Sequence, residues 1–160
     1  MFRKKINLSA FLFLTLVFIY SCIDDDVCNE VTTPRLTIVL DSLGSKYKKN
    51  SLYVDRKNAD GTISQEGIFL GKDSIKITLN ALSNETVYYF YDSANTLDSD
   101  KNSITVRYQT EHKFVSKACG FKVLYNQVTY EGSYLTNIKS ITPLTTEIHN
   151  ESSTNLRISY

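Results

Sequence analysis

Residues 104–109 read ITVRYQ, and this stretch shows the pattern that decides the fold. Its apolar residues Ile104, Val106 and Tyr108 fall at every second position, with polar residues between them. Successive side chains of a β-strand point to opposite faces, so this alternation predicts a strand that is buried on one face. A helix would instead place its apolar residues three and four positions apart.

The same alternation recurs along most of the chain. The clearest further examples are RLTIVL at 35–40, SIKITL at 74–79, FKVLYN at 121–126 and NLRISY at 155–160. Shorter candidate strands are SLYVD at 51–55, TVYYFY at 86–91 and HKFVS at 112–116, and YLTNIKSI at 134–141 is a weaker one. No segment after the N-terminal region has a sustained helical spacing of apolar residues.

Turn-forming residues separate these candidate strands, at 43–45 (LGS), 58–61 (NADG), 71–73 (GKD) and in the polar loop 92–103. Many short strands with frequent turns predict an all-β fold, namely a single antiparallel β-sandwich that is immunoglobulin-like. A small β-barrel is the alternative. The chain has no internal repeat and no second linker, so we expect one domain over residues 33–160.

The N-terminus has the composition of a secretory signal peptide. Arg3, Lys4 and Lys5 form a basic start, and residues 10–20 are apolar apart from Thr15. This run has 11 residues, whereas a membrane-spanning helix needs about 20. The sequence therefore predicts export.

Residues 19–22, IYSC, resemble the lipobox of bacterial lipoproteins, in which an aliphatic and a small residue precede a cysteine. The resemblance implies that residues 1–21 are a lipoprotein signal peptide, removed before Cys22, and that the Cys22 thiol is acylated. It also implies a lipidated acidic tether over residues 22–32, and attachment to a membrane through the lipid.

Asp24, Asp25 and Asp26 follow the lipobox and resemble the surface-export signal of lipoproteins from the Bacteroidota. That resemblance implies a lipid-anchored protein of the outer membrane, exposed on the cell surface. A periplasm-facing protein is the alternative, with the aspartates as a solvated, self-repelling tether.

Removing residues 1–21 leaves 15 Lys and Arg residues against 17 Asp and Glu residues. Nucleic-acid binding needs a basic face, so this balance argues against it.

Once Cys22 is acylated, Cys28 and Cys119 remain, in a compartment where disulfides persist. The even remainder predicts that they pair, with Cα atoms within about 7 Å. Each cysteine precedes a predicted strand, so the bond would fix the root of the tether to a sheet edge. Two free thiols, or a metal pair that lacks further ligands, are the alternatives.

The sequence offers little support for catalysis, for a cofactor or for a metal. His112 and His149 are not at metal-ligand spacing, and the common nucleophile, zinc and phosphate motifs are absent. Residues 98–103 (DSDKNS) resemble half of a calcium loop, but Ser103 replaces the turn glycine and Gln109 the closing glutamate. A polar hairpin loop is the better interpretation.

Residues 88–91 (YYFY) must show aromatic rings on both faces of their strand. Outward tyrosines could stack on a sugar or contact a partner, and packing within the sheet is the alternative.

Three Asp-Ser pairs resemble the general O-glycosylation site of exported Bacteroidota proteins, which implies possible modification of Ser42, Ser74 and Ser93. Chance occurrence of three Asp-Ser turns is equally open.

The lipobox, the second cysteine, the stretches TTPRLTI and KACGFK, and the C-terminal strand together resemble an uncharacterised Bacteroidota lipoprotein family. We therefore expect a lipid-anchored cell-envelope protein, non-enzymatic, that is a structural or interaction module with an unknown envelope partner. A glycan-binding accessory lipoprotein is the alternative, and an envelope hydrolase or isomerase is the third hypothesis. A tyrosine cluster beside a shallow groove would favour the second, and a deep pocket at His112 or His149 the third.

Overall fold

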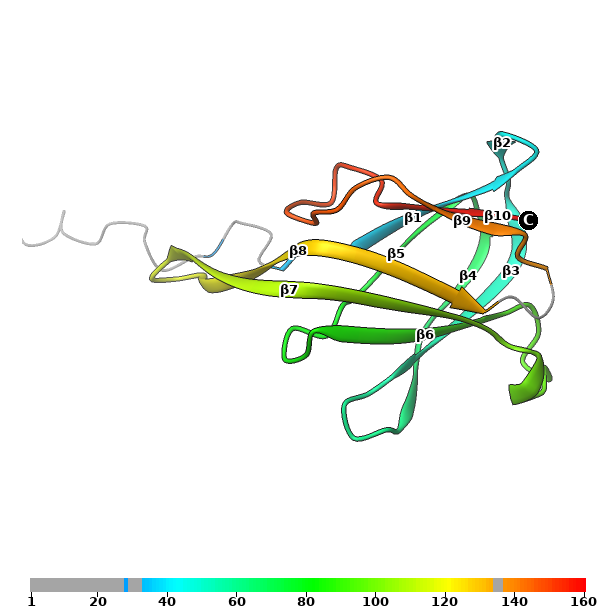
Figure 1. Cartoon of the computed structure of the whole chain (residues 1–160), viewed down its shortest axis with the longest axis horizontal. Coiled ribbons are helices and arrows are strands. Elements are labelled where there is room, and N and C mark those ends of the chain that lie inside the picture. Colours follow the sequence, from blue (N-terminus) through cyan, green and yellow to red (C-terminus); the bar gives the residue numbers. More distant parts are fainter. Residues whose placement is uncertain (1–27, 29–32, 134–136) are drawn as a thin grey trace, which may run out of the picture.

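Two five-stranded β-sheets face each other across a shared core (Figure 1). The structure is a computed structural model that describes residue 28, residues 33–133 and residues 137–160. Sheet A has the order β2-β1-β10-β9, with β5 also paired to β1, and sheet B has the order β4-β3-β6-β7-β8. The predicted all-β sandwich is therefore confirmed, and the described residues form no closed barrel.

The strands of sheet A are β1 (Leu36–Ser42), β2 (Ser45–Lys46), β5 (Ser74–Ile77), β9 (Ser140–Pro143) and β10 (Leu156–Ser159). The strands of sheet B are β3 (Lys49–Lys57), β4 (Ile63–Lys72), β6 (Glu85–Tyr91), β7 (Asn102–Ser116) and β8 (Gly120–Ser133). A single 3₁₀ turn, η1 (Asp98–Asp100), precedes β7.

One pair of strands departs from the predicted antiparallel arrangement. β1 and β10 run parallel, with Ile38 opposite Leu156 and Leu40 opposite Ile158. The other strand pairs are antiparallel. The parallel pair places the first and last strands of the domain side by side in the middle of sheet A.

The alternating residues build the core from both sheets. Ile104 is 1% exposed, Val106 is fully buried and Tyr108 is 3% exposed, as the opening stretch predicts. Several apolar side chains of sheet A are fully buried, among them Leu36, Ile38, Leu40, Leu156 and Ile158. Burying one side chain of this size stabilises the fold by about 1.5–3 kcal/mol relative to leaving it exposed.

Three strand predictions need correction. HKFVS at 112–116 is not a separate strand but the second half of β7, because no turn residue interrupts the chain between Gln109 and His112. β4 is not predicted at all, because a β-bulge breaks its alternation. Gly67 pairs with Val54 and Gln65 with Asp55, so Glu66 between them is the extra residue. The weak strand predicted at 134–141 begins only at Ser140, and residues 134–136 lie outside the described residues.

The β7–β8 hairpin extends beyond the rest of the sandwich, at the left of Figure 1. β7 has 15 residues and β8 has 14, so each spans about 45–50 Å. In β7 the regular buried face ends at Tyr108, and in β8 the buried residues lie between Val123 and Val128. We call the projecting part, residues 110–122, the hairpin tip.

Candidate functional site

The predicted disulfide is present at the hairpin tip. Cys28 and Cys119 are 91 residues apart in sequence, and their Cα atoms are 4.8 Å apart. Cys119 lies in the turn just before β8, which is an edge strand of sheet B. The predicted pairing is therefore confirmed, and the bond joins Cys28 to the turn before this edge strand.

Thr33, the first residue described after Cys28, contacts β8. The backbone N–H of Val123 donates a hydrogen bond to Oγ1 of Thr33, at 3.3 Å. Pro34 is buried next, and β1 follows. The proposed lipid site Cys22, the aspartates 24–26, the signal peptide and the tether other than Cys28 lie outside the described residues.

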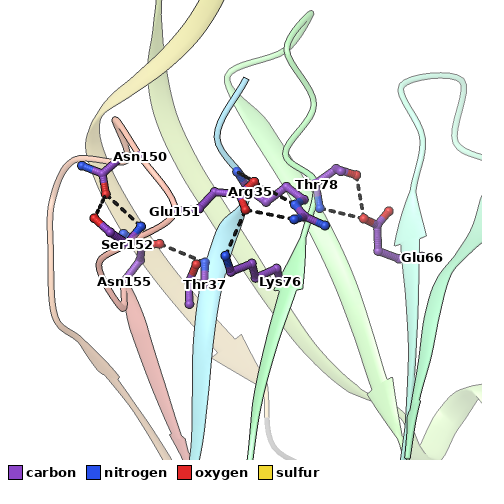
Figure 2. A network of polar contacts seen from close by, with 9 residues as sticks. All are labelled: Arg35, Thr37, Glu66, Lys76, Thr78, Asn150, Glu151, Ser152 and Asn155. Atoms are coloured by element: carbon purple, nitrogen blue, oxygen red, sulfur yellow. Dashed lines mark hydrogen bonds and ion pairs between the residues drawn. The ribbon is translucent and has the colours of Figure 1, made fainter. Parts of the chain in front are cut away.

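Glu151 joins the start of β1 to β5 through two cations (Figure 2). The Arg35 guanidinium donates two hydrogen bonds to its carboxylate, from Nε at 2.8 Å and from Nη2 at 2.9 Å, and Lys76 Nζ donates a third at 3.0 Å. The Arg35 contact, followed by the Lys76 contact, lowers the pKa of Glu151 to about 2. Arg35 and Glu151 are 116 positions apart, so this site joins the residue before β1 to the segment before β10, two neighbouring strands of sheet A.

Asn155 supports the same region from the inside (Figure 2). It is fully buried, its Oδ1 accepts a hydrogen bond from the Thr37 backbone N–H at 2.9 Å, and its Nδ2 donates to Thr145 Oγ1 at 3.1 Å. Outside the core, Asn150 Oδ1 accepts bonds from the N–H and hydroxyl of Ser152. These bonds fix the long segment between β9 and β10 and so hold Glu151 in place.

The bulged residue Glu66 forms a similar polar contact at the edge of sheet B (Figure 2). Its Oε1 accepts hydrogen bonds from both the backbone N–H and the hydroxyl of Thr78, each at 2.6 Å. Arg56 Nη1 donates to the same hydroxyl at 2.8 Å. The bulge that hides β4 from the sequence pattern thus joins β4 to the segment after β5.

The four aromatic residues at 88–91 divide between the two faces, as predicted. Tyr88 and Phe90 belong to the core, and Tyr91 lies on the outer face of sheet B. There the Tyr91 ring stacks on Tyr53, with centroids 5.3 Å apart, and its hydroxyl donates to Asp55 at 3.0 Å. This outer tyrosine pair is therefore held within the sheet by its own neighbours.

A second tyrosine pair borders a hollow of about 450 Å³. The rings of Tyr47 and Tyr160 lie 5.7 Å apart, and Lys49 Nζ lies 3.8 Å from the centroid of the Tyr160 ring. Asp92, which also borders the hollow, pairs with Lys49 at 3.0 Å. Because Tyr47 is 38% exposed, this hollow offers one aromatic face beside several polar groups.

The family described as "Family of unknown function (DUF6452)" matches residues 40–160. The chain belongs to this family. The expectation of an uncharacterised family is thereby confirmed. No curated protein and no solved structure has a significant match to the chain.

The histidines of this DUF6452 chain lie apart, at different sites. His112 is exposed on the hairpin tip, whereas His149 borders an open hollow of about 320 Å³. The Nε2 atom of His149 is 2.7 Å from Asn126 Oδ1, and its Nδ1 is 3.8 Å from the Glu147 carboxylate. Among the described residues, the hydrogen bonds of His149 therefore involve no hydroxyl or thiol that it could activate.

The loop that resembles half a calcium site joins β6 to β7 in the DUF6452 fold, and these strands are an antiparallel pair. It is thus the polar hairpin loop that the sequence favours. Over residues 28, 33–133 and 137–160, no three His, Cys, Asp or Glu residues are grouped closely enough to hold a metal ion. Within that same part of the chain, no helix has the length and apolar composition needed to cross a membrane.

The three candidate O-glycosylation sites of the DUF6452 chain differ in accessibility. Ser74 and Ser93 are exposed. Ser42 is half-buried, and its hydroxyl donates a hydrogen bond to the Tyr160 carbonyl at 3.1 Å. A glycan on Ser42 would have to break this bond, so the structure favours the other two serines.

Sequence reasoning missed two features of the DUF6452 chain. The contact of Glu151 with Arg35 joins residues far apart in sequence, and no local pattern indicates it. Phe114 and Phe121 look like core residues in their alternating strands, yet they are 55% and 64% exposed. The lysines next to them, at 113 and 122, are the sequence signal that these two phenylalanines lie outside the core.

Proposed function

We propose that the protein is a lipid-anchored module of the bacterial cell envelope, held at the outer membrane through Cys22. The β-sandwich would support or bind other envelope components and would not catalyse a reaction. The observation that carries this proposal is the disulfide between Cys28 and Cys119. Structural disulfides form and persist in exported proteins, and this one leaves Cys22, the lipobox cysteine, as the third of three cysteines.

The position of the disulfide also suits a tethered protein. Cys28 is six positions after Cys22, so the folded part begins almost immediately behind the proposed lipid. A short tether with a fixed root gives the sandwich a defined direction relative to the membrane.

Metabolic labelling with an alkyne fatty acid tests the anchor. The wild-type chain should acquire the tag, and Cys22→Ala should abolish it, because the thiol is the acylated atom. The matched control is the double variant Cys28→Ser, Cys119→Ser, which should keep the tag. Equal labelling of the Cys22→Ala chain would refute the lipid anchor.

Crosslinking in intact cells tests the interaction role. The wild-type chain should form a discrete crosslinked product with an envelope component, and the Cys22→Ala chain should lose it because it leaves the membrane. A wild-type chain that gives no such product, while its anchor is intact, would contradict the interaction role.

Glycan binding is the second candidate, favoured by the hollow beside Tyr47 and Tyr160. An exposed tyrosine ring with adjacent lysine, aspartate and asparagine side chains can stack on a sugar and hydrogen-bond its hydroxyls. Envelope polysaccharide should then retain the wild-type chain on an affinity column, and Tyr47→Ala should lose retention. Tyr53→Ala, on the outer face of sheet B, is the control. Equal retention of both variants would exclude this hollow as the site.

A further inference from the structure

The inner face of β8 stays apolar beyond the point where the core ends, whereas β7 places Thr110 and His112 opposite Tyr125 and Val123. Along β8 the exposed fraction rises from 0% at Tyr125 and 7% at Val123 to 64% at Phe121. Phe114 lies directly opposite Phe121 in β7 and is 55% exposed. The two rings pack edge to face, with centroids 5.4 Å apart. The tip therefore presents a pair of aromatic rings outside the sandwich.

The other face of the tip is cationic. Lys113 and Lys122 lie directly opposite each other and alternate with the two phenylalanines, so they belong to the other face. Lys113 is exposed, whereas Lys122 is half-buried and borders a hollow beside Pro34 and Glu151. Lys117 is exposed in the turn between the strands. Within residues 110–122 the only acidic residue is Glu111, which accepts a hydrogen bond from Asn126.

Aromatic rings beside lysines are typical of segments that lie in a membrane interface. The rings settle at headgroup level, and the long lysine side chains extend their ammonium groups to the phosphates. Exposed apolar patches mark contact sites for membranes or for other proteins, and the lysines beside these rings favour the membrane.

The disulfide places this tip beside the proposed lipid. Cys119 is two residues before Phe121 and is bonded to Cys28, which is six positions after Cys22. Six extended residues span at most about 20 Å. If Cys22 is acylated, Cys28 and the tip residue bonded to it must therefore lie within about that distance of the bilayer surface.

We propose that the hairpin tip is a second membrane contact, in which Phe114 and Phe121 enter the headgroup region of the bilayer that holds the lipid on Cys22. The exposed Lys113 and Lys117 contact the lipid phosphates. This proposal rests on the proposed lipid anchor and adds to it a defined orientation: the hairpin stands on the membrane, and the sandwich projects from it.

Tryptophan fluorescence provides a direct test, because the chain contains no tryptophan. The variant Phe121→Trp is made in the full, acylated chain and reconstituted into vesicles of phosphatidylethanolamine and phosphatidylglycerol. Its emission should shift to shorter wavelength, and brominated lipids in the same vesicles should quench it.

Leu97→Trp is the matched control. Leu97 is 69% exposed and lies just before η1, at the opposite end of β7 from the tip. Its tryptophan should keep a water-like emission and escape quenching. If Trp at 121 is equally unquenched, the membrane contact is overturned and the tip is left for a protein partner.

The lysines are tested by charge reversal in the Phe121→Trp chain. Lys113→Glu and Lys117→Glu together should reduce the quenching, because the glutamates repel anionic headgroups. Reversal of Lys46 and Lys48, which are exposed elsewhere on the sandwich, should leave it unchanged. Equal quenching in the two double variants would overturn the phosphate contact.

Two measurements on the same samples separate this proposal from the anchor. Intact mass reports acylation of Cys22, and flotation reports attachment to vesicles. A chain that is neither acylated nor floated contradicts the proposed function itself. A chain that is acylated and floats, yet shows an unquenched tryptophan at 121, overturns only the contact of the tip.

Discussion

At the scale of single residues, Glu151 has the most specific chemistry that the structure offers. Two cations, Arg35 and Lys76, converge on its carboxylate from the start of β1 and from β5. Such bidentate, charge-assisted contacts are stronger than ordinary surface pairs. The carboxylate therefore connects three segments of sheet A at the end of the sandwich nearest the tether root.

This contact predicts a particular dependence of stability on pH. The pKa of Glu151 is about 2 in the folded chain, below its ordinary value of 4.5. The ionised form is thus favoured by folding, so its contribution is complete above about pH 4.5 and is lost as the pH falls towards 2. Glu151→Gln should unfold more easily than wild type at neutral pH, and the difference should shrink across that acidic range.

Chemical denaturation at a series of pH values measures this difference. The control is Glu131→Gln, since Glu131 is exposed and pairs with the exposed Arg107; it should change stability little. A gap between Glu151→Gln and wild type that stays constant down to pH 2 would contradict the assigned contact.

The exposure of the candidate glycosylation sites gives a second prediction at this scale. In protein from its native host, Ser74→Ala and Ser93→Ala should each lower the intact mass by one glycan. Ser42→Ala should leave the mass unchanged apart from the substitution itself, because the Ser42 hydroxyl is half-buried and bonded to Tyr160. A wild-type mass equal to that of the lipidated polypeptide would show that none of the three serines is modified.

At the scale of strands, the sequence pattern predicts the strands that have one buried face. It does not predict strands whose faces are both exposed. β1, β5 and β10 show the alternation because every second side chain of these strands points into the core, as Leu36, Ile75 and Ile158 do. β4 is an edge strand whose side chains are nearly all exposed or half-buried, and its bulge at Glu66 breaks the period. Its formation depends on pairing with β3, which no local pattern reports.

The hairpin tip shows the opposite error, in which the sequence pattern assigns an exposed residue to the core. Phe121 follows the alternating pattern of FKVLYN, so it is expected in the core, and Phe114 lies directly opposite it. The strands, however, continue beyond the edge of sheet A, and no partner layer covers the rings among the described residues. Periodicity therefore predicts which face a residue occupies, but not whether a second sheet lies against that face.

The disulfide gives the element-scale prediction. A two-stranded ribbon is marginally stable alone, so the tip depends on the bond to Cys28 and on the Thr33 contact. The double variant Cys28→Ser, Cys119→Ser should lose about 2–4 kcal/mol of unfolding free energy. Residues 110–122 should also exchange their amide hydrogens faster than the rest of β7 and β8.

Guanidinium unfolding and hydrogen exchange of the chain carrying Cys22→Ala provide the measurement, with that single variant as the reference. The reference should retain the bond and full stability. Identical unfolding midpoints with and without the disulfide would show that the tip is held by other contacts.

At the scale of the whole molecule, the tip and the C-terminal end of the chain lie at opposite ends of the sandwich (Figure 1). The hollow beside Tyr47 and Tyr160 is at the C-terminal end. If Cys22 and the tip face the membrane, this hollow faces away from it. The sequence predicts the disulfide that sets this direction, from the count of cysteines, but not the hollow, because its residues come from segments distant in the chain.

This orientation also makes surface display measurable. An epitope inserted between Leu43 and Gly44 lies in an exposed turn after β1, where Leu43 is 95% exposed. Antibody should bind this epitope on intact cells, because the proposed anchor places the sandwich outside the outer membrane. Replacing Asp24, Asp25 and Asp26 with alanine removes the proposed export signal, so binding should then require a permeabilised outer membrane.

The matched control replaces the same three aspartates with glutamate, which keeps the negative charge directly behind Cys22. If charge carries the signal, the glutamate chain should stay accessible on intact cells while the alanine chain does not. Total antibody binding after permeabilisation should be equal in all three chains, which excludes a difference in abundance. Equal binding of the alanine and wild-type chains on intact cells would leave the aspartates with the role of a solvated tether alone.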